Sequence, residues 1–184
     1  MQKFFFILFA TLLFAGTVNA QKFFTRAGKV TFTSEAPVEK IEAVNQSATA
    51  VLDTESNRME FAILIKAFQF EKALMQEHFN ENYMESSTFP KATFKGQIDA
   101  AAPANWGKDG TYPVTLSGDM TIHGVTQKLT APGTITIKGG AIAAQSTFTV
   151  AVADYGIEIP SVVAENIAKE VTIAVDVQLA QLNK

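Results

Sequence analysis

The sequence predicts an all-β fold, an eight-stranded antiparallel barrel with a helical insertion between the third and fourth strands. Three observations lead to this prediction. Apolar and polar residues alternate with a period of two in eight separate segments, which is the pattern of strands with one buried face. Short turn sequences separate most of these segments, so neighbouring strands should run antiparallel. One segment breaks the alternation and has the spacing of a helix.

The first three strands are expected over residues 23–34, 38–52 and 59–66. Val30 and Phe32 face inward on the first strand, and the second is expected to bend near Asn45. The pair Ser56-Asn57 suits a hairpin turn before the third strand. The inward face of the third strand is the apolar set Met59, Phe61, Ile63 and Ile65.

The helical insertion follows, with a lid expected over residues 74–84. Apolar residues recur here at spacings of three to five, so that Glu71, Glu77 and Glu81 face water on the other side. Pro90 prevents the helix from continuing, and residues 89–96 return the chain to the wall. Because a lone helix in a sheet protein needs a role, we expect this one to close the mouth of the barrel. Its apolar face consists of Phe70, Leu74, Met75, His78, Phe79 and Tyr83.

Five more strands complete the pattern, over residues 94–99, 114–122, 129–137, 142–152 and 171–179. The pairs His123-Gly124 and Gly139-Gly140 suit two-residue turns with positive φ. Residues 154–168 are expected to form a strand end, a break at Pro160 and a short helix. This segment either makes a second flap over the mouth or packs against the barrel.

Eight strands with one apolar face close naturally into an up-and-down barrel, although a two-sheet sandwich produces the same alternation. Several inward positions hold small residues. These either mark strand bends or leave part of the interior empty. An empty interior with apolar walls would accommodate a long apolar chain. The small inward residues are Gly96, Gly118, Ala131, Gly133, Ala144 and Ser146.

Residues 1–20 have the pattern of a secretory signal cleaved after Ala20. Lys3 precedes an apolar run over residues 4–15, and small residues precede the cleavage position. The run is shorter than the roughly 20 residues that cross a bilayer, and no later apolar segment approaches that length, so no transmembrane segment is expected. Residues 21–184 should therefore form a single domain in the periplasm or outside the cell.

Composition argues against several classes of function. The chain has no Cys, so it has neither a disulfide nor a thiol nucleophile nor a thiolate metal site. A net charge of −3 without a basic cluster argues against nucleic acid as a partner. A zinc site would require His78 and His123 to meet a carboxylate such as Glu77 or Asp119. We expect no metal, no cofactor and no catalytic residue, and a hydrolase with His78 or His123 as base is the alternative.

Three ordered segments resemble the YceI-like family of exported lipid-binding proteins, in the form common among Bacteroidetes. They are residues 75–84 (MQEHFNENYM), 89–96 (FPKATFKG) and 118–126 (GDMTIHGVT), with weaker support from residues 154–157 and 170–182. The resemblance implies a lipocalin-like barrel that holds a polyisoprenoid or similar lipid, and a homodimer fits it as well. The chain departs from the family pattern at residues 24–28 and at Gln76-Glu77, where polar head-group contacts would lie.

We therefore expect a binding protein without catalysis that carries or stores a long apolar lipid in the cell envelope. A polyisoprenoid, an isoprenoid quinone and a fatty-acyl chain all fit, and a structural partner with a filled barrel is a further alternative. His78 either donates to a head group or is a core or capping His, whereas a structural role is expected for His123 in its tight turn. The expected ligand contacts are Phe61, Ile63, Phe70, Leu74, Met75, His78, Phe79, Met84, Phe94, Leu116, Met120, Ile135, Phe148, Val150, Tyr155 and Ile157.

Overall fold

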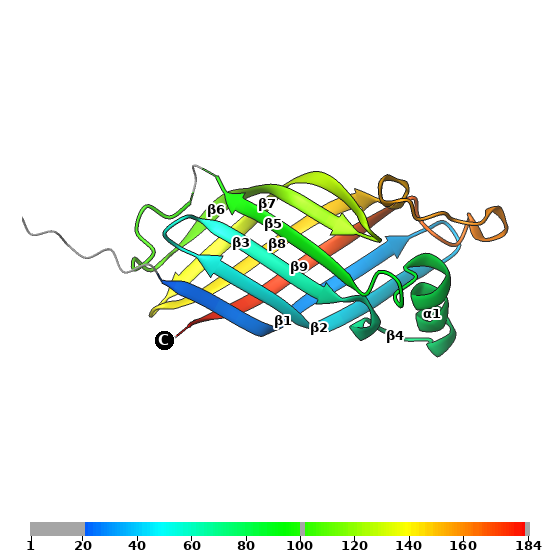
Figure 1. The fold of residues 1–184 in the computed structure, drawn as a ribbon, viewed down its shortest axis with the longest axis horizontal. Coiled ribbons are helices and arrows are strands. Elements are labelled where there is room, and N and C mark those ends of the chain that lie inside the picture. Colours follow the sequence, from blue (N-terminus) through cyan, green and yellow to red (C-terminus); the bar gives the residue numbers. More distant parts are fainter. Residues whose placement is uncertain (1–20, 100–101, 183–184) are drawn as a thin grey trace, which may run out of the picture.

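A computed structural model describes residues 21–99 and 102–182, so the predicted signal over residues 1–20 lies outside the described residues. Eight antiparallel strands form a closed barrel (Figure 1). The pairing order is β1-β9-β8-β7-β6-β5-β3-β2, and the pairing of β1 with β2 closes the ring. The barrel prediction is confirmed, and the sandwich alternative is wrong. The strands are β1 (Lys22–Glu35), β2 (Lys40–Asp53), β3 (Arg58–Leu64), β5 (Lys91–Ile98), β6 (Gly110–Ile122), β7 (Val125–Lys138), β8 (Ala141–Ala151) and β9 (Glu170–Gln181).

The register of the strands follows the alternation in the sequence. Phe61 on β3 is paired with Phe94 on β5, which is paired in turn with Met120 on β6. Partners in antiparallel strands point to the same face, so these three side chains lie side by side on the inner wall. The expected bend of β2 is present as an irregular register between Asn45 and Ala48. Positive φ angles occur at three predicted turns, at Asn57, His123, Gly124, Gly139 and Gly140.

The helical insertion is less regular than the sequence predicts, and Phe70, which was expected on its apolar face, lies in a strand instead. Gln69–Phe70 forms a short strand, β4, which pairs with β2 beyond the end of β3. The helix α1 therefore begins only at Ala73 and ends at His78, and a π-helical turn follows over Phe79–Tyr83. The amide of Met84 accordingly donates to the carbonyl of Phe79, five residues back, at 2.9 Å. We call residues 73–83 the lid.

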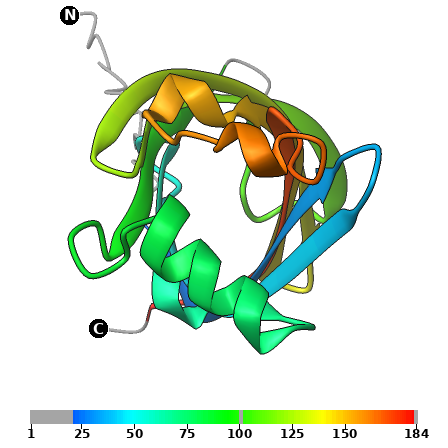
Figure 2. The same ribbon diagram turned by 90° about the vertical axis from the view of Figure 1, so that its right-hand side faces the viewer.

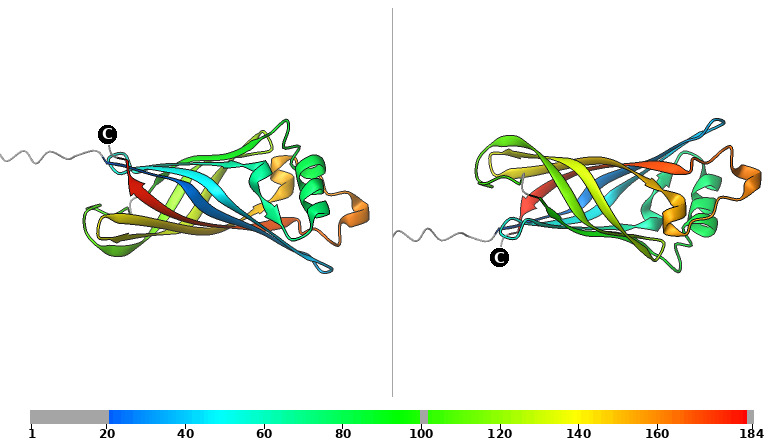
Figure 3. Two further views of the ribbon diagram at one scale, coloured as in Figure 1. Left: turned by 90° about the horizontal axis from the view of Figure 1, so that it is seen from below. Right: turned by 90° about the horizontal axis from the view of Figure 1, so that it is seen from above.

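The segment between β8 and β9 also differs from its prediction. A 3₁₀ turn spans Val152–Tyr155, where the end of a strand was predicted. After Pro160 the predicted short helix is present as a single 3₁₀ turn over Ser161–Val163. We call residues 152–168 the flap. Viewed along the barrel, α1 crosses one side of the barrel end and the flap crosses the other (Figure 2). The lid, the flap and the β1–β2 hairpin all lie at this end, which we call the mouth (Figure 3).

The opposite end of the barrel is closed by packed side chains. Leu52, Ile98 and Ile142 are at most 1% exposed and belong to one hydrophobic cluster. Trp106, from the connection between β5 and β6, packs against this cluster, and its Nε1 donates to Asn57 Oδ1 at 3.2 Å. This end therefore stabilises the barrel and leaves the mouth as the way in. Among the described helices, none is long and apolar enough to span a bilayer.

Candidate ligand-binding cavity

The mouth leads into an apolar cavity of about 420 Å³, which we call the outer chamber. Its walls come from the inner faces of the barrel strands, from the lid and from the flap. Small-molecule pockets in proteins usually measure roughly 300–1,000 Å³, so the outer chamber has the size of a binding site. The predicted contact residues that line it are Ile63, Phe70, Leu74, Met75, His78, Phe79, Met84, Met120, Val150, Tyr155 and Ile157.

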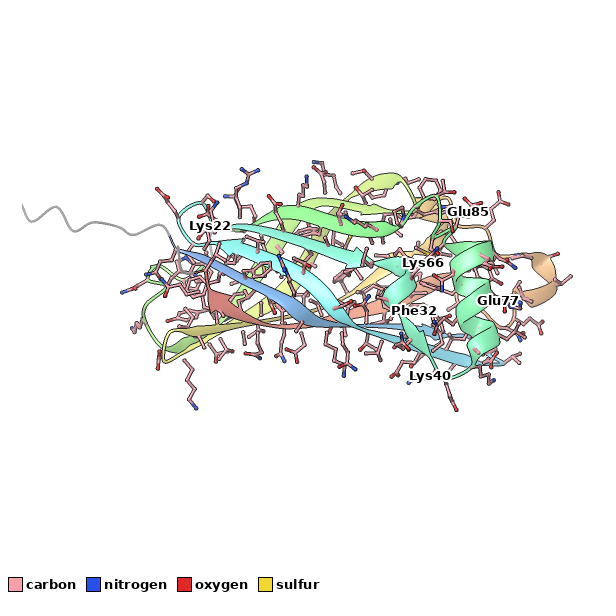
Figure 4. All side chains as sticks on the ribbon, turned by 60° about the horizontal axis from the view of Figure 1, so that its bottom comes forward. Lys22, Phe32, Lys40, Lys66, Glu77 and Glu85 are labelled. Carbon is pink, nitrogen blue, oxygen red and sulfur yellow. The ribbon has the colours of Figure 1, made fainter. Side chains whose placement is uncertain are left out.

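Four phenylalanines join the lid to the barrel wall. Phe79 of the lid stacks on Phe32 of β1 with ring centroids 5.7 Å apart, and it lies 4.9 Å from Phe70 and 5.7 Å from Phe68. Phe32 lies near the lid end of the barrel, far from Lys22 (Figure 4). Phe32 and Phe68 also line the outer chamber, yet neither was a predicted contact. The predicted inward position of Phe32 on its strand could have identified it as a contact residue.

The polar lining of the outer chamber carries little net charge. The Lys72 ammonium lies 2.8 Å from Glu39 Oε1, and this hydrogen bond, together with the negative charge of Glu39, raises the pKa of Lys72. Ser34 Oγ accepts a hydrogen bond from the Ala168 amide at 2.9 Å, which ties the flap to β1. The charged residues that line the chamber, Glu39 and Lys72, thus already neutralise each other, and His78 adds one exposed imidazole.

A second cavity, the inner chamber, lies deeper in the barrel and measures only about 70 Å³. Ile63, Ala92, Met120 and Ile173 line both chambers and so mark the boundary between them. The inner chamber accounts for the remaining predicted contacts. These are Phe61, Phe94, Leu116, Ile135 and Phe148, and Ile63 and Met120 are shared with the outer chamber. All the predicted contacts thus lie on cavity walls, and their contact with a ligand stays a prediction.

The inward glycines do not leave the interior empty. A Cβ added at Gly96 would overlap the Phe94 ring, and one added at Gly133 would lie 2.6 Å from Leu116 Cδ1. At Gly118 the added atom would overlap the backbone of Gly96 and Lys95. Glycine is therefore needed at these positions because neighbouring groups already occupy the space. For these three glycines the interpretation that they leave space is wrong, whereas the other three small residues, Ala131, Ala144 and Ser146, do line the inner chamber. Most of the empty volume lies nearer the mouth.

His123 connects three loops at the mouth without lining either chamber. Its Nε2 lies 3.2 Å from Glu85 Oε2 and its Nδ1 lies 3.3 Å from the Tyr155 carbonyl oxygen. The ring also packs edge-on against Phe89, with centroids 4.6 Å apart. These contacts fit the structural role expected for His123. Within residues 21–99 and 102–182, no cluster of His and carboxylate side chains could hold a metal, and neither His is hydrogen-bonded to a hydroxyl group.

Comparison with known proteins relates this architecture to a family. The chain matches the YceI-like domain family over residues 14–179. A solved polyisoprenoid-binding domain from Saccharophagus degradans, implicated in plant cell wall breakdown, is similar at a TM-score of 0.75 and 16% identity, over 89% of this chain and 99% of that one. Burkholderia cenocepacia BcnA is similar at a TM-score of 0.65 and 22% identity, over 83% of this chain and 96% of that one. A Campylobacter jejuni YceI protein is similar at a TM-score of 0.56 and 15% identity, over 75% of this chain and 81% of that one. No match was found among curated proteins.

Proposed function

The chain belongs to the YceI-like domain family, and on that premise we propose that it is an exported binding protein that encloses the tail of a long apolar lipid. The observation that carries the proposal is the outer chamber, an apolar space of about 420 Å³ that lies under a lid and a flap. The similar domain from Saccharophagus degradans, which is described as polyisoprenoid-binding, supports the same class of ligand. The ligand is a polyisoprenoid, an isoprenoid quinone or a fatty-acyl chain.

Burial of the apolar tail supplies the binding energy. Each methylene moved from water into an apolar site contributes about 0.8 kcal/mol, so a tail of several methylenes outweighs the cost of ordering the lipid. The walls suit this purpose because they are mainly Phe, Ile, Val and Met. The polar residues Lys72, Glu39, His78 and Asn166 are left for the head group. Their balanced charge favours a head group with little charge.

Entry of the lipid requires the lid to move, and the packing of the lid allows it. Neither α1 nor the π-helical turn contains a buried residue. Phe79 packs against three phenylalanine rings, but the lid as a whole is less buried than the strands. Segments with few buried contacts open at a lower free-energy cost than closely packed strands do. The lid is therefore the element that admits and releases the lipid, and binding needs no catalytic step. We propose that the protein carries or stores lipid in the cell envelope.

Mass spectrometry of lipid extracts from protein purified without detergent tests the proposal directly. We expect a co-purified lipid, and we expect added isoprenoid quinone or fatty acid to bind when the protein is first delipidated. Val150, which is 8% exposed and lines the outer chamber, provides the variant Val150→Asp. A buried carboxylate at this position should abolish binding, because an uncompensated charge in an apolar site is strongly unfavourable.

Thr149→Asp is the matched control, because it places the same carboxylate on the exposed face of the same strand. It should retain binding, and thermal unfolding of both variants shows whether loss of binding is loss of fold. If neither co-purified nor added lipid binds to the folded wild-type protein, the proposed function is wrong.

Export and dimerisation complete the proposal. Export depends on residues 1–20, and N-terminal sequencing of the protein from the producing cell should begin at Gln21. A mature protein that starts at Met1 would contradict export. The homodimer is suggested by the family resemblance, and sedimentation at several protein concentrations tests it, with a monomer throughout as the contrary result.

A further inference from the structure

The boundary between the two chambers is built from several strands at once. Ile63, Ala92, Met120 and Ile173 come from β3, β5, β6 and β9, and each lines both chambers. On the outer side of this boundary the cavity measures about 420 Å³, and on the inner side about 70 Å³. The barrel therefore encloses much less free volume on the inner side of this boundary than on the outer side, although the ring of strands continues.

The narrowing has a local cause on β5 and β6. Phe94 and Met120 are register partners and point to the same inner face. Phe94 is 5% exposed, and its ring lies over Gly96, the residue two positions deeper into the barrel. Phe94 thus fills the space that the glycine would otherwise leave. Met120 is only half-buried and borders the open chamber.

We propose that Met120, supported by Phe94, is the floor of the binding site and sets the longest tail that the outer chamber can bury. The inference rests on the proposed function and deepens it, because it defines the ligand class by the length of its tail. An inner chamber of about 70 Å³ lies far below the size of ordinary ligand pockets and offers a continuing tail much less room than the outer chamber does. A longer tail must leave its remaining carbons outside the outer chamber.

Affinity should therefore depend on chain length in two phases. While the tail is shorter than the outer chamber, each added methylene becomes buried and tightens binding about fourfold. Once the tail reaches Met120, further methylenes gain no burial and affinity stops rising. The chain length at this break is the quantity that Met120 is proposed to determine.

The experiment measures displacement of a fluorescent fatty acid by straight-chain primary alcohols, in a series from octanol to tetracosanol. An uncharged head group keeps the effect of the tail separate from the charges at the mouth. Met120→Ala removes three heavy atoms from the floor, and we expect it to move the break to longer chains by about three methylenes. Phe94→Leu, which also removes three heavy atoms, should move the break in the same direction.

Met75→Ala is the matched control, because it removes the same atoms from the lid, where Met75 lines the outer chamber alone. It should weaken binding of all alcohols by a similar factor and leave the break at the same chain length. Circular dichroism confirms that each variant retains the barrel.

The outcomes separate this inference from the proposed function. If wild-type affinity rises across the whole series without a break, or if the break is unchanged in folded Met120→Ala, the floor assignment is wrong while lipid binding stands. If no alcohol and no fatty acid binds to the wild-type protein, the proposed function fails and this inference fails with it.

Discussion

The closed end and the mouth of the barrel are built from the same strands but fill their inward positions differently. At the closed end, Leu52, Ile98 and Ile142 are at most 1% exposed and pack in one cluster. At the mouth, the strands surround about 420 Å³ of apolar space, and the helical lid contains no buried residue. The difference teaches that stability and binding are separated along the barrel axis. Close packing at the closed end offsets the packing that is lost around the cavity at the mouth.

The largest expected effect is a loss of unfolding free energy. It is tested by a Leu→Ala substitution made separately at each end of the barrel. Leu52→Ala removes a fully buried side chain at the closed end and should lower the free energy of unfolding by about 2–5 kcal/mol. Leu74→Ala makes the same substitution in the lid, where the residue is 61% exposed. It should change the free energy of unfolding by less than about 0.5 kcal/mol. Urea denaturation measures both. Equal losses would contradict the division of the barrel into a stabilising end and a binding end.

Sequence reasoning predicts the scaffold well because strand alternation is a strong signal. The faces of β3, β5 and β6 follow directly from the period of two, and the register confirms them at Phe61, Phe94 and Met120. Turn chemistry predicts the hairpins for a similarly local reason, since His123-Gly124 and Gly139-Gly140 supply the positive φ that such turns require. These features depend on short stretches of chain, which a single sequence displays.

The division into two chambers could not be predicted in the same way. The alternation of the strand predicts that Phe94 points inward. It does not predict that the Phe94 ring lies over Gly96 and fills space in the inner barrel. The lid shows a similar limit. Its spacing of three to five residues indicates a helix. The start of α1 at Ala73, by contrast, depends on the pairing of Phe70 with Ala43, and the π-helical turn includes Phe79, which contacts distant parts of the chain. Such features arise from tertiary contacts.

A smaller effect, local loosening of the lid, is expected from Phe79→Ala. This variant tests whether the aromatic cluster holds the lid to the barrel wall. Phe79 contacts three phenylalanine rings, and each aromatic pair contributes about 0.5–1.5 kcal/mol beyond burial. The substitution should accelerate amide hydrogen exchange across residues 73–83 and leave exchange in β8 and β9 unchanged. Glu77→Ala, an exposed change in the same helix, is the control. Faster exchange throughout the barrel would show that the mouth and the closed end are not independent.

The smallest effect concerns Tyr155, which lies in the flap and is 4% exposed. Burial, and secondarily the negative charge of Asp154, raise the pKa of Tyr155 above its ordinary value of 10.0. In the unfolded chain the phenol ionises near that ordinary value. The folded protein therefore holds this proton more tightly, and the contribution is fully present below pH 10.0 and is lost as the pH rises through the folded pKa.

Above pH 10.0 the wild-type protein should thus lose unfolding free energy faster than Tyr155→Phe does, because the variant has no proton to release at this position. Phenolate absorbance during a pH titration, compared between the two proteins, locates the ionisation itself. A difference spectrum that titrates at the ordinary value would mean that water reaches the phenol, so that the flap does not cover this side of the mouth. A raised value means that water is excluded from the Tyr155 phenol, although this side chain lines the outer chamber.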